Sequence, residues 1–142
     1  METNKFSLSL KEKETYLKVI EGYDKKILGL WAIDCSERVL PYFENEFPKD
    51  KRPKIAINTL KEYIKTGIFK MAVIIKASLD SHKSAKEIGN NSPAASAAHS
   101  AGQAVATAHV YTHSIGAALY ALQAIYRKTN SLTEVEKERK CG

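Results

Sequence analysis

The sequence predicts an all-α protein, a compact multi-helix bundle of about five to six helices without a sheet. Apolar residues recur three and four positions apart along most of the chain, and no segment alternates between apolar and polar residues for long. Glycine, proline and helix-capping residues separate these periodic segments. The segment from Pro93 to Arg127 is rich in alanine and other small residues, which is typical of a buried helix or helix pair.

The chain length predicts one domain that spans residues 1–142, with flexible tails at 1–8 and 130–142. A chain of 142 residues buries enough surface to fold without a disulfide or a structural metal. Cys35 lies in an apolar helical pattern and is expected in the core, whereas Cys141 is expected to be exposed in the polar tail. The lack of a signal peptide and of a long apolar run favours a cytoplasmic protein that does not span a membrane.

The first two helices are predicted from their caps. Ser9 and Glu12 fit a capping box, which predicts a helix from about Leu10 to Glu21. Asp24 can cap a second helix, whose apolar positions are Leu28, Trp31, Cys35 and Val39. Pro41 falls inside this pattern and removes one backbone hydrogen bond, so either a kink or a break into two helices is expected there.

Two further helices follow a loop that ends at Pro53. This proline suits the first turn of a helix, where its missing N–H costs nothing, and the helix is expected to end at Gly67. Its predicted buried positions are Ala56, Ile57, Leu60 and Ile64. The next helix is predicted to bury a stripe made of Phe69, Ala72, Ile75, Leu79 and His82.

The last long helical pattern begins with Ser92 as the cap and Pro93 as the first residue, and extends from Ala94 to Lys128. It carries two adjacent stripes. The apolar stripe consists of Ala98, Ala101, Val105, Ala108, Thr112, Ile115, Leu119, Leu122 and Tyr126. The second consists of Gly102, Ala106, His109, His113 and Gly116. Each glycine lowers helix stability by ~1 kcal/mol relative to alanine, so either packing compensates or the segment breaks into two helices near a glycine.

His109 and His113 are candidate metal ligands, because residues four apart on one helical face can share a metal ion. Zinc requires at least a third ligand, and the candidates on other helices are Asp34, Glu37 and His82. His99 is excluded, since ten residues of continuous helix would separate it from His109 by about 15 Å. We favour the alternative, in which both histidines pack among alanines and form hydrogen bonds with a carboxylate or a carbonyl, so no metal or cofactor is predicted.

Asp34 and Arg38 form a candidate ion pair, because they are four residues apart. Their sequence neighbours are largely apolar, so Asp34 is expected to be at least partly buried and to need a partner. The favoured interpretation is a structural ion pair completed by a histidine of the alanine-rich segment, and the alternative is an acid–base or metal site. No catalytic residue is predicted, since the chain has no nucleophile elbow, phosphate-binding loop or Cys-x-x-Cys pair.

The basic residues give the chain a net charge of +6. The lysines are distributed along the chain and mostly alternate with apolar residues, which is typical of the solvent-exposed faces of helices and disfavours nucleic-acid binding. In the segment from Asp50 to Pro53, Arg52 has two open interpretations. Either it contacts a partner, or it is tied to a nearby acidic residue such as Glu44 or Glu46.

Three segments resemble motifs of a family assigned as immunity proteins of bacterial polymorphic toxin systems. The first consists of Trp31-Ala32, Asp34-Cys35, Glu37-Arg38-Val39-Leu40-Pro41 and Phe43-Glu44. The second consists of Asp50, Arg52-Pro53 and Ala56-Ile57, and the third of Ala106-Thr107-Ala108-His109-Val110, Thr112-His113 and Gly116-Ala117. The resemblance extends from Asp24 to Tyr126.

The resemblance implies an all-helical protein that binds and blocks a cognate toxin without catalysis. The family is assigned largely by genomic context, so the resemblance gives no roles to the motif residues. Immunity proteins against nucleases tend to be acidic, so either the toxin is not a nuclease or the family label describes another function. A protein-binding module is therefore the leading hypothesis. The alternative is a helical metal-binding protein or metalloenzyme that uses His109, His113 and a carboxylate such as Asp34, and a homodimer also stays open.

Overall fold

The computed structural model describes residues 10–130 and 134–137, and within them it contains helices and no strand. The helices are α1 (Leu10–Glu21), α2 (Lys25–Glu44), α3 (Arg52–Thr66), α4 (Met71–Glu87), α5 (Pro93–Ala106) and α6 (His113–Thr129). A single helical turn follows at residues 134–137. The predicted all-α fold is confirmed. None of the helices in the described residues is both long and apolar enough to cross a bilayer.

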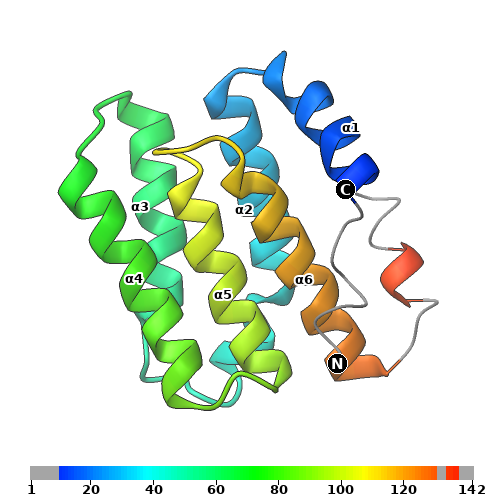
Figure 1. Ribbon diagram of the computed structural model, residues 1–142. Helices are drawn as coiled ribbons and strands as arrows, with labels where there is room; N and C mark the ends of the chain where they lie inside the picture. The colour runs from blue at the N-terminus through cyan, green and yellow to red at the C-terminus, as the bar shows by residue number, and fades with distance from the viewer. Residues whose placement is uncertain (1–9, 131–133, 138–142) are drawn as a thin grey trace.

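Helix α5 is the centre of the bundle. It contacts α2, α3, α4 and α6, and Figure 1 shows it between α4 on one side and α6 on the other. Eleven of its 14 residues are buried, and most of them are alanine, serine or glycine. Small side chains allow neighbouring helices to approach closely, which explains how one helix can pack against four others. The sequence-based prediction of a buried helix in this segment is confirmed.

Several helix ends follow their predicted caps. The side chain of Asp24 accepts a hydrogen bond of 2.7 Å from the backbone N–H of Lys26, and α2 begins at Lys25, directly after Asp24. Ser92 accepts a hydrogen bond of 3.1 Å from the N–H of Ala95 in the same way. Gly67 ends α3 at φ 72°, a left-handed conformation that glycine adopts without a Cβ clash. The predicted capping box lies partly outside the described residues, because Ser9 is not among them.

Pro41 does not break α2, which continues to Glu44. The carbonyl of Pro41 accepts a hydrogen bond of 2.9 Å from the N–H of Asn45, so the last turn forms normally. Leu28, Cys35 and Val39 are buried as predicted. The predicted tails lie mostly outside the described residues, but the buried side chain of Val135, in the turn at 134–137, packs with the core cluster that contains Cys35 and Val39.

The segment from Ala94 to Lys128 forms two helices, but the break does not occur at a glycine. Helix α5 ends at Ala106 and α6 begins at His113. The intervening residues include β-branched threonine and valine as well as histidine, which have lower helix propensity than alanine. Gly102 and Gly116 lie inside the helices, where a Cβ would come within 2.8 Å of the side chains of His82 and Gln103 respectively. These glycines therefore permit close packing between helices.

The predicted register of α4 is wrong. Its buried face consists of Ile74, Ala77, Ser81, Ser84 and Ala85, whereas Ile75 is 40% exposed and Leu79 is 62% exposed. The N-terminal half of α4 is apolar on two sides, so periodicity alone could not select the buried one. Small residues decide the outcome, because they allow α4 to pack closely on α5. The hydroxyl of Ser81, for example, donates a hydrogen bond of 2.7 Å to the carbonyl of Ala98.

Candidate functional site

The first motif lies along α2, where its charged residues face outward. Asp34 and Arg38 form the predicted ion pair at 3.1 Å, but the side chain of Asp34 is 55% exposed, so its predicted burial is wrong. Its apolar neighbours in the sequence point elsewhere because each residue of a helix is rotated by about 100° from the last. Glu37 pairs with Lys61 of α3 at 2.7 Å. Both contacts are surface ion pairs, which contribute little to stability.

The apolar part of this motif belongs to the core. Cys35 is 3% exposed, as predicted for a small core residue. Trp31 is half-buried and packs against the same core cluster as Cys35. These two residues therefore have packing roles in α2.

Arg52, in the second motif, connects the start of α3 with the end of α4. Its guanidinium donates two hydrogen bonds to the carboxylate of Asp50, at 2.9 and 2.7 Å, and two to the carboxylate of Glu87, at 3.3 and 2.8 Å. These hydrogen bonds lower the pKa of Asp50 and of Glu87. Arg52 is thus tied to acidic residues, but to these two and not to Glu44 or Glu46. The buried Pro53 occupies the first turn of α3, as predicted.

The third motif contains the α5–α6 turn, which separates the two candidate metal ligands. His109 lies exposed in this turn with its ring stacked on Phe69, at a centroid distance of 6.4 Å. His113 begins α6, and its Nδ1 is hydrogen-bonded to Oε1 of Gln103 at 2.7 Å. The prediction that both histidines lie on one face of a continuous helix is wrong, because α5 ends before His109 and α6 begins at His113. Across residues 10–130 and 134–137, no group of three or more His, Cys, Asp or Glu side chains could hold a metal ion.

Thr112, the remaining motif residue, is the residue before α6. Its backbone has φ −65° and ψ −17°, and its side chain makes no capping hydrogen bond. A threonine at this position usually caps a helix through its hydroxyl, and here it does not.

A histidine pair that the sequence analysis missed joins α4 and α5. Nδ1 of His82 lies 2.6 Å from Nδ1 of His99, and Nε2 of His99 lies 2.9 Å from Oδ1 of Asn90. Because Asn90 accepts a hydrogen bond from Nε2–H, the neutral ring of His99 has a free lone pair at Nδ1, and His82 is the donor of the shared hydrogen bond. The ring of His99 also stacks on Tyr120 of α6, at a centroid distance of 4.9 Å.

The environment of this pair favours the neutral rings. Burial, followed by the repulsion that a protonated His82 would exert and by the charges of Lys86 and Arg127, lowers the pKa of His99 to about 4. Burial, followed by Lys86 and His113, also lowers the pKa of His82. The pair therefore acts as an uncharged cross-link between helices at neutral pH.

A signal for this pair was present in the sequence. Positions 82 and 99 lie eight residues before and nine residues after position 90, the centre of the turn that joins α4 to α5. Residues placed symmetrically about the turn of a helical hairpin lie at the same level of the two helices. The spacing of residues within one helix predicts neighbours such as His109 and His113, but it gives no information about a pair formed between two helices.

Other polar groups of the interior also connect helices. The hydroxyl of Ser36 is hydrogen-bonded to that of Ser100 at 2.8 Å, and Ser96 donates to Gln123 at 2.8 Å. In the described part of the chain, every buried side-chain nitrogen and oxygen atom has a hydrogen-bond partner. These hydrogen bonds hold neighbouring helices together.

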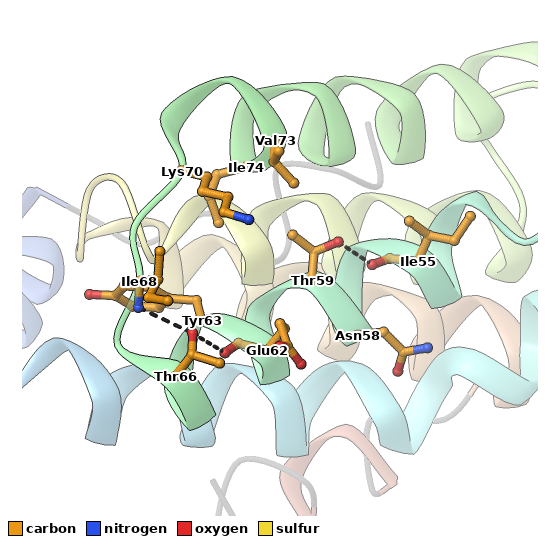
Figure 2. Close-up of a pocket in the computed structure, with 10 residues that line it drawn as sticks. All are labelled: Ile55, Asn58, Thr59, Glu62, Tyr63, Thr66, Ile68, Lys70, Val73 and Ile74. Atoms are coloured by element: carbon orange, nitrogen blue, oxygen red, sulfur yellow. Dashed lines mark hydrogen bonds between the residues drawn. The ribbon is translucent and has the colours of Figure 1, made fainter.

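An open groove lies between α3 and α4. Its volume is ≈ 350 Å³, and it is lined by Ile55, Asn58, Thr59, Glu62, Tyr63, Thr66, Ile68, Lys70, Val73 and Ile74. Figure 2 shows Ile55, Thr59 and Tyr63 on α3, with Lys70, Val73 and Ile74 on the other side. The segment between the helices closes one end through Ile68. This groove is a concave, largely apolar surface on the outside of the bundle.

The fold and these surfaces define an all-helical protein whose interior polar groups hold helices together and whose outer helices present apolar and charged side chains. The chain matches the family described as "Imm-5 like putative immunity protein" over residues 18–141, and it belongs to that family. The match includes all three motif segments, so the resemblance noted from the sequence is confirmed. Neither a curated protein nor a solved structure matches the chain.

Proposed function

We propose that this protein binds a cognate toxin and neutralises it by occupying the toxin's surface, without chemistry of its own. The observation that carries the proposal is the family match, which covers residues 18–141. An immunity protein needs a stable scaffold and a complementary surface, and it needs no catalytic residues.

The structure supports this proposal because its interior and its surface differ in how their side chains are used. The buried polar side-chain atoms of the described residues all have hydrogen-bond partners, while large apolar side chains are exposed on α3 and α4. Exposed apolar patches on a folded protein commonly mark binding sites for other proteins. The net charge of +6 favours a toxin with an acidic contact surface, and hence a toxin other than a nuclease with a basic cleft.

A survival assay tests the proposal. The product of the neighbouring gene, as the candidate toxin, is expressed in the cytoplasm from an inducible promoter, with and without this protein, and colony formation is counted. We expect survival only when both proteins are produced, together with co-elution of the two proteins in gel filtration. Equal killing at equal expression, with no co-elution, contradicts the proposal.

A further inference from the structure

The positive charge of the chain is concentrated on one helical hairpin. Between Arg52 and Glu87, which span α3 and α4, there are eight Lys and Arg residues and three Asp and Glu residues. This surplus of five accounts for nearly all of the net charge of +6. The distribution of lysines along the sequence concealed this asymmetry, which becomes evident only when the charges are assigned to helices.

The same hairpin exposes most of the large apolar side chains found on the surface. The described residues include 12 exposed large hydrophobic side chains, and seven of them lie on this hairpin: Ile55, Ile68, Phe69, Met71, Val73, Ile75 and Leu79. Three of the seven, Ile55, Ile68 and Val73, line the groove between α3 and α4, and exposed apolar clusters on folded monomers commonly mark binding sites for a partner. A surface that combines apolar side chains with one sign of charge selects a partner with both complementary properties.

The groove between α3 and α4 brings these features together. Tyr63 and the buried Ile74 are part of its lining, and the half-exposed Val73 stands at its edge. Lys70 lines the groove from the α4 side and Glu62 from the α3 side. Lys65 is exposed on α3, next in sequence to the lining residue Thr66, so the basic side chains at this end outnumber the acidic one. Within the described chain neither lysine forms an ion pair, whereas Lys61 and Lys76 are paired with Glu37 and Asp80. The unpaired lysines are therefore available to a partner's carboxylates.

We propose that this groove is the docking site for an acidic amphipathic helix of a protein partner. Apolar side chains on one face of that helix occupy the space between Val73 and Tyr63, and flanking Asp or Glu residues pair with Lys65 and Lys70. Recognition of an amphipathic helix by a groove depends on such anchors at i, i+3 or i+4, and i+7. The proposal rests on the proposed function, because the toxin would be the protein that carries this helix.

The shape and chemistry of the groove favour a peptide over a nucleic acid or a membrane. Nucleic-acid sites gain most of their affinity from phosphate contacts, for which the exposed aliphatic side chains are not needed. An apolar patch that inserts into a bilayer surface is usually the face of one amphipathic helix. Here the apolar side chains line a concave groove between two helices, which can accept a row of side chains that projects from a partner helix.

Two pairs of variants test this docking site in the full chain, with the product of the neighbouring gene, the candidate toxin, as the probe. Val73→Asp places a charge at the groove, and Ile27→Asp is its matched control, because the two side chains are 50% and 53% exposed. Lys65→Glu with Lys70→Glu reverses the charge, and Lys18→Glu with Lys25→Glu is the control on α1 and α2. Thermal unfolding confirms that each variant folds.

We expect both groove variants to raise the Kd about ten-fold or more, while the controls stay within about two-fold of wild type. The charge reversal should also weaken the salt dependence of binding. If wild type binds the toxin and the groove variants bind equally well, the docking site is wrong and the proposed function stands.

If wild type does not bind the toxin, the proposed function fails, and a synthetic helical peptide with leucines at i, i+4 and i+7 and flanking glutamates tests the groove. Chemical shift changes at Thr59 and Ile74 that Val73→Asp abolishes support the inference. The absence of such changes overturns it. So does tighter binding to duplex DNA or to phosphatidylserine vesicles than to the peptide.

Discussion

Helix α5 and the α3–α4 hairpin differ in almost every surface property. In α5, 11 of 14 residues are buried, nearly all are small, and none is a charged Asp, Glu, Lys or Arg. On the hairpin, eight basic side chains and seven exposed apolar side chains face outward or line the groove. The difference shows that the two regions are constrained in different ways. The side chains of α5 are limited in size by the short distances between helices, whereas many side chains of the hairpin are exposed and are not limited in this way.

The largest effect is expected where α5 meets α4 at Gly102. A Cβ at this position would come within 2.7 Å of the imidazole of His82, so Gly102→Leu must displace the ring or the helix. We expect a loss of about 3 kcal/mol in the free energy of unfolding, measured with urea. Gly22→Leu is the matched control, because a Cβ there meets nothing closer than 4.0 Å and should change stability by less than about 0.5 kcal/mol. Equal losses in both variants would contradict the close contact.

The His82–His99 pair gives the next largest effect, as a dependence of stability on pH. The pKa of His99 is about 4 in the folded chain and near its ordinary value of 6.5 in the unfolded chain. Between these values the unfolded chain binds more protons, so stability falls as the pH is lowered from 6.5 towards 4. We expect a loss on the order of 2 kcal/mol between pH 7 and pH 4.5. His99→Phe keeps the aromatic stack but cannot be protonated, so it should flatten this slope; an unchanged slope would show that other groups cause it.

A smaller effect is expected at Arg52. Arg52→Ala removes the hydrogen bonds that join the start of α3 to Glu87 and leaves the carboxylate of Asp50 without its main partner. We expect a loss of about 1 kcal/mol in the free energy of unfolding, together with a rise of the Asp50 pKa followed by NMR titration. Lys76→Ala, which removes the exposed pair with Asp80, serves as the comparison and should be nearly neutral.

The smallest effect is expected on the outer side of α4. Leu79→Ala should change the free energy of unfolding by less than about 0.5 kcal/mol, because this side chain is 62% exposed. The same substitution at Leu60, which is 1% exposed, should cost roughly 2–5 kcal/mol. A large loss at Leu79 in urea unfolding would mean that this stripe is covered in the free protein, which would contradict its assignment as an open surface.

Local signals were sufficient for most of the fold. The bounds of the helices follow from residues that act within one turn, such as Asp24, Ser92 and Gly67. The choice between two apolar sides of α4 depends on the partner helix, and periodicity carries no information about that partner. For this reason Leu79 was assigned to the wrong face.

The candidate site was predicted less well than the fold. The Asp34–Arg38 pair and the packing role of Cys35 could be read from spacing and pattern. The exposure of Asp34, the acidic partner of Arg52 on α4 and the contact between His82 and His99 all depend on how helices are placed in space. The metal-site interpretation required His109 and His113 to lie on one face of a continuous helix, and the helix ends before His109.

The packing of α5 also has an evolutionary consequence. Where a helix buries 11 of 14 residues against four others, nearly every enlargement of a side chain disturbs several interfaces at once. Substitutions that preserve folding are therefore expected mainly on the outer helices. The α3–α4 hairpin is the most tolerant of them where its exposed side chains make few packing contacts. A lineage can in this way acquire a new binding partner by altering that surface while the centre of the bundle stays the same.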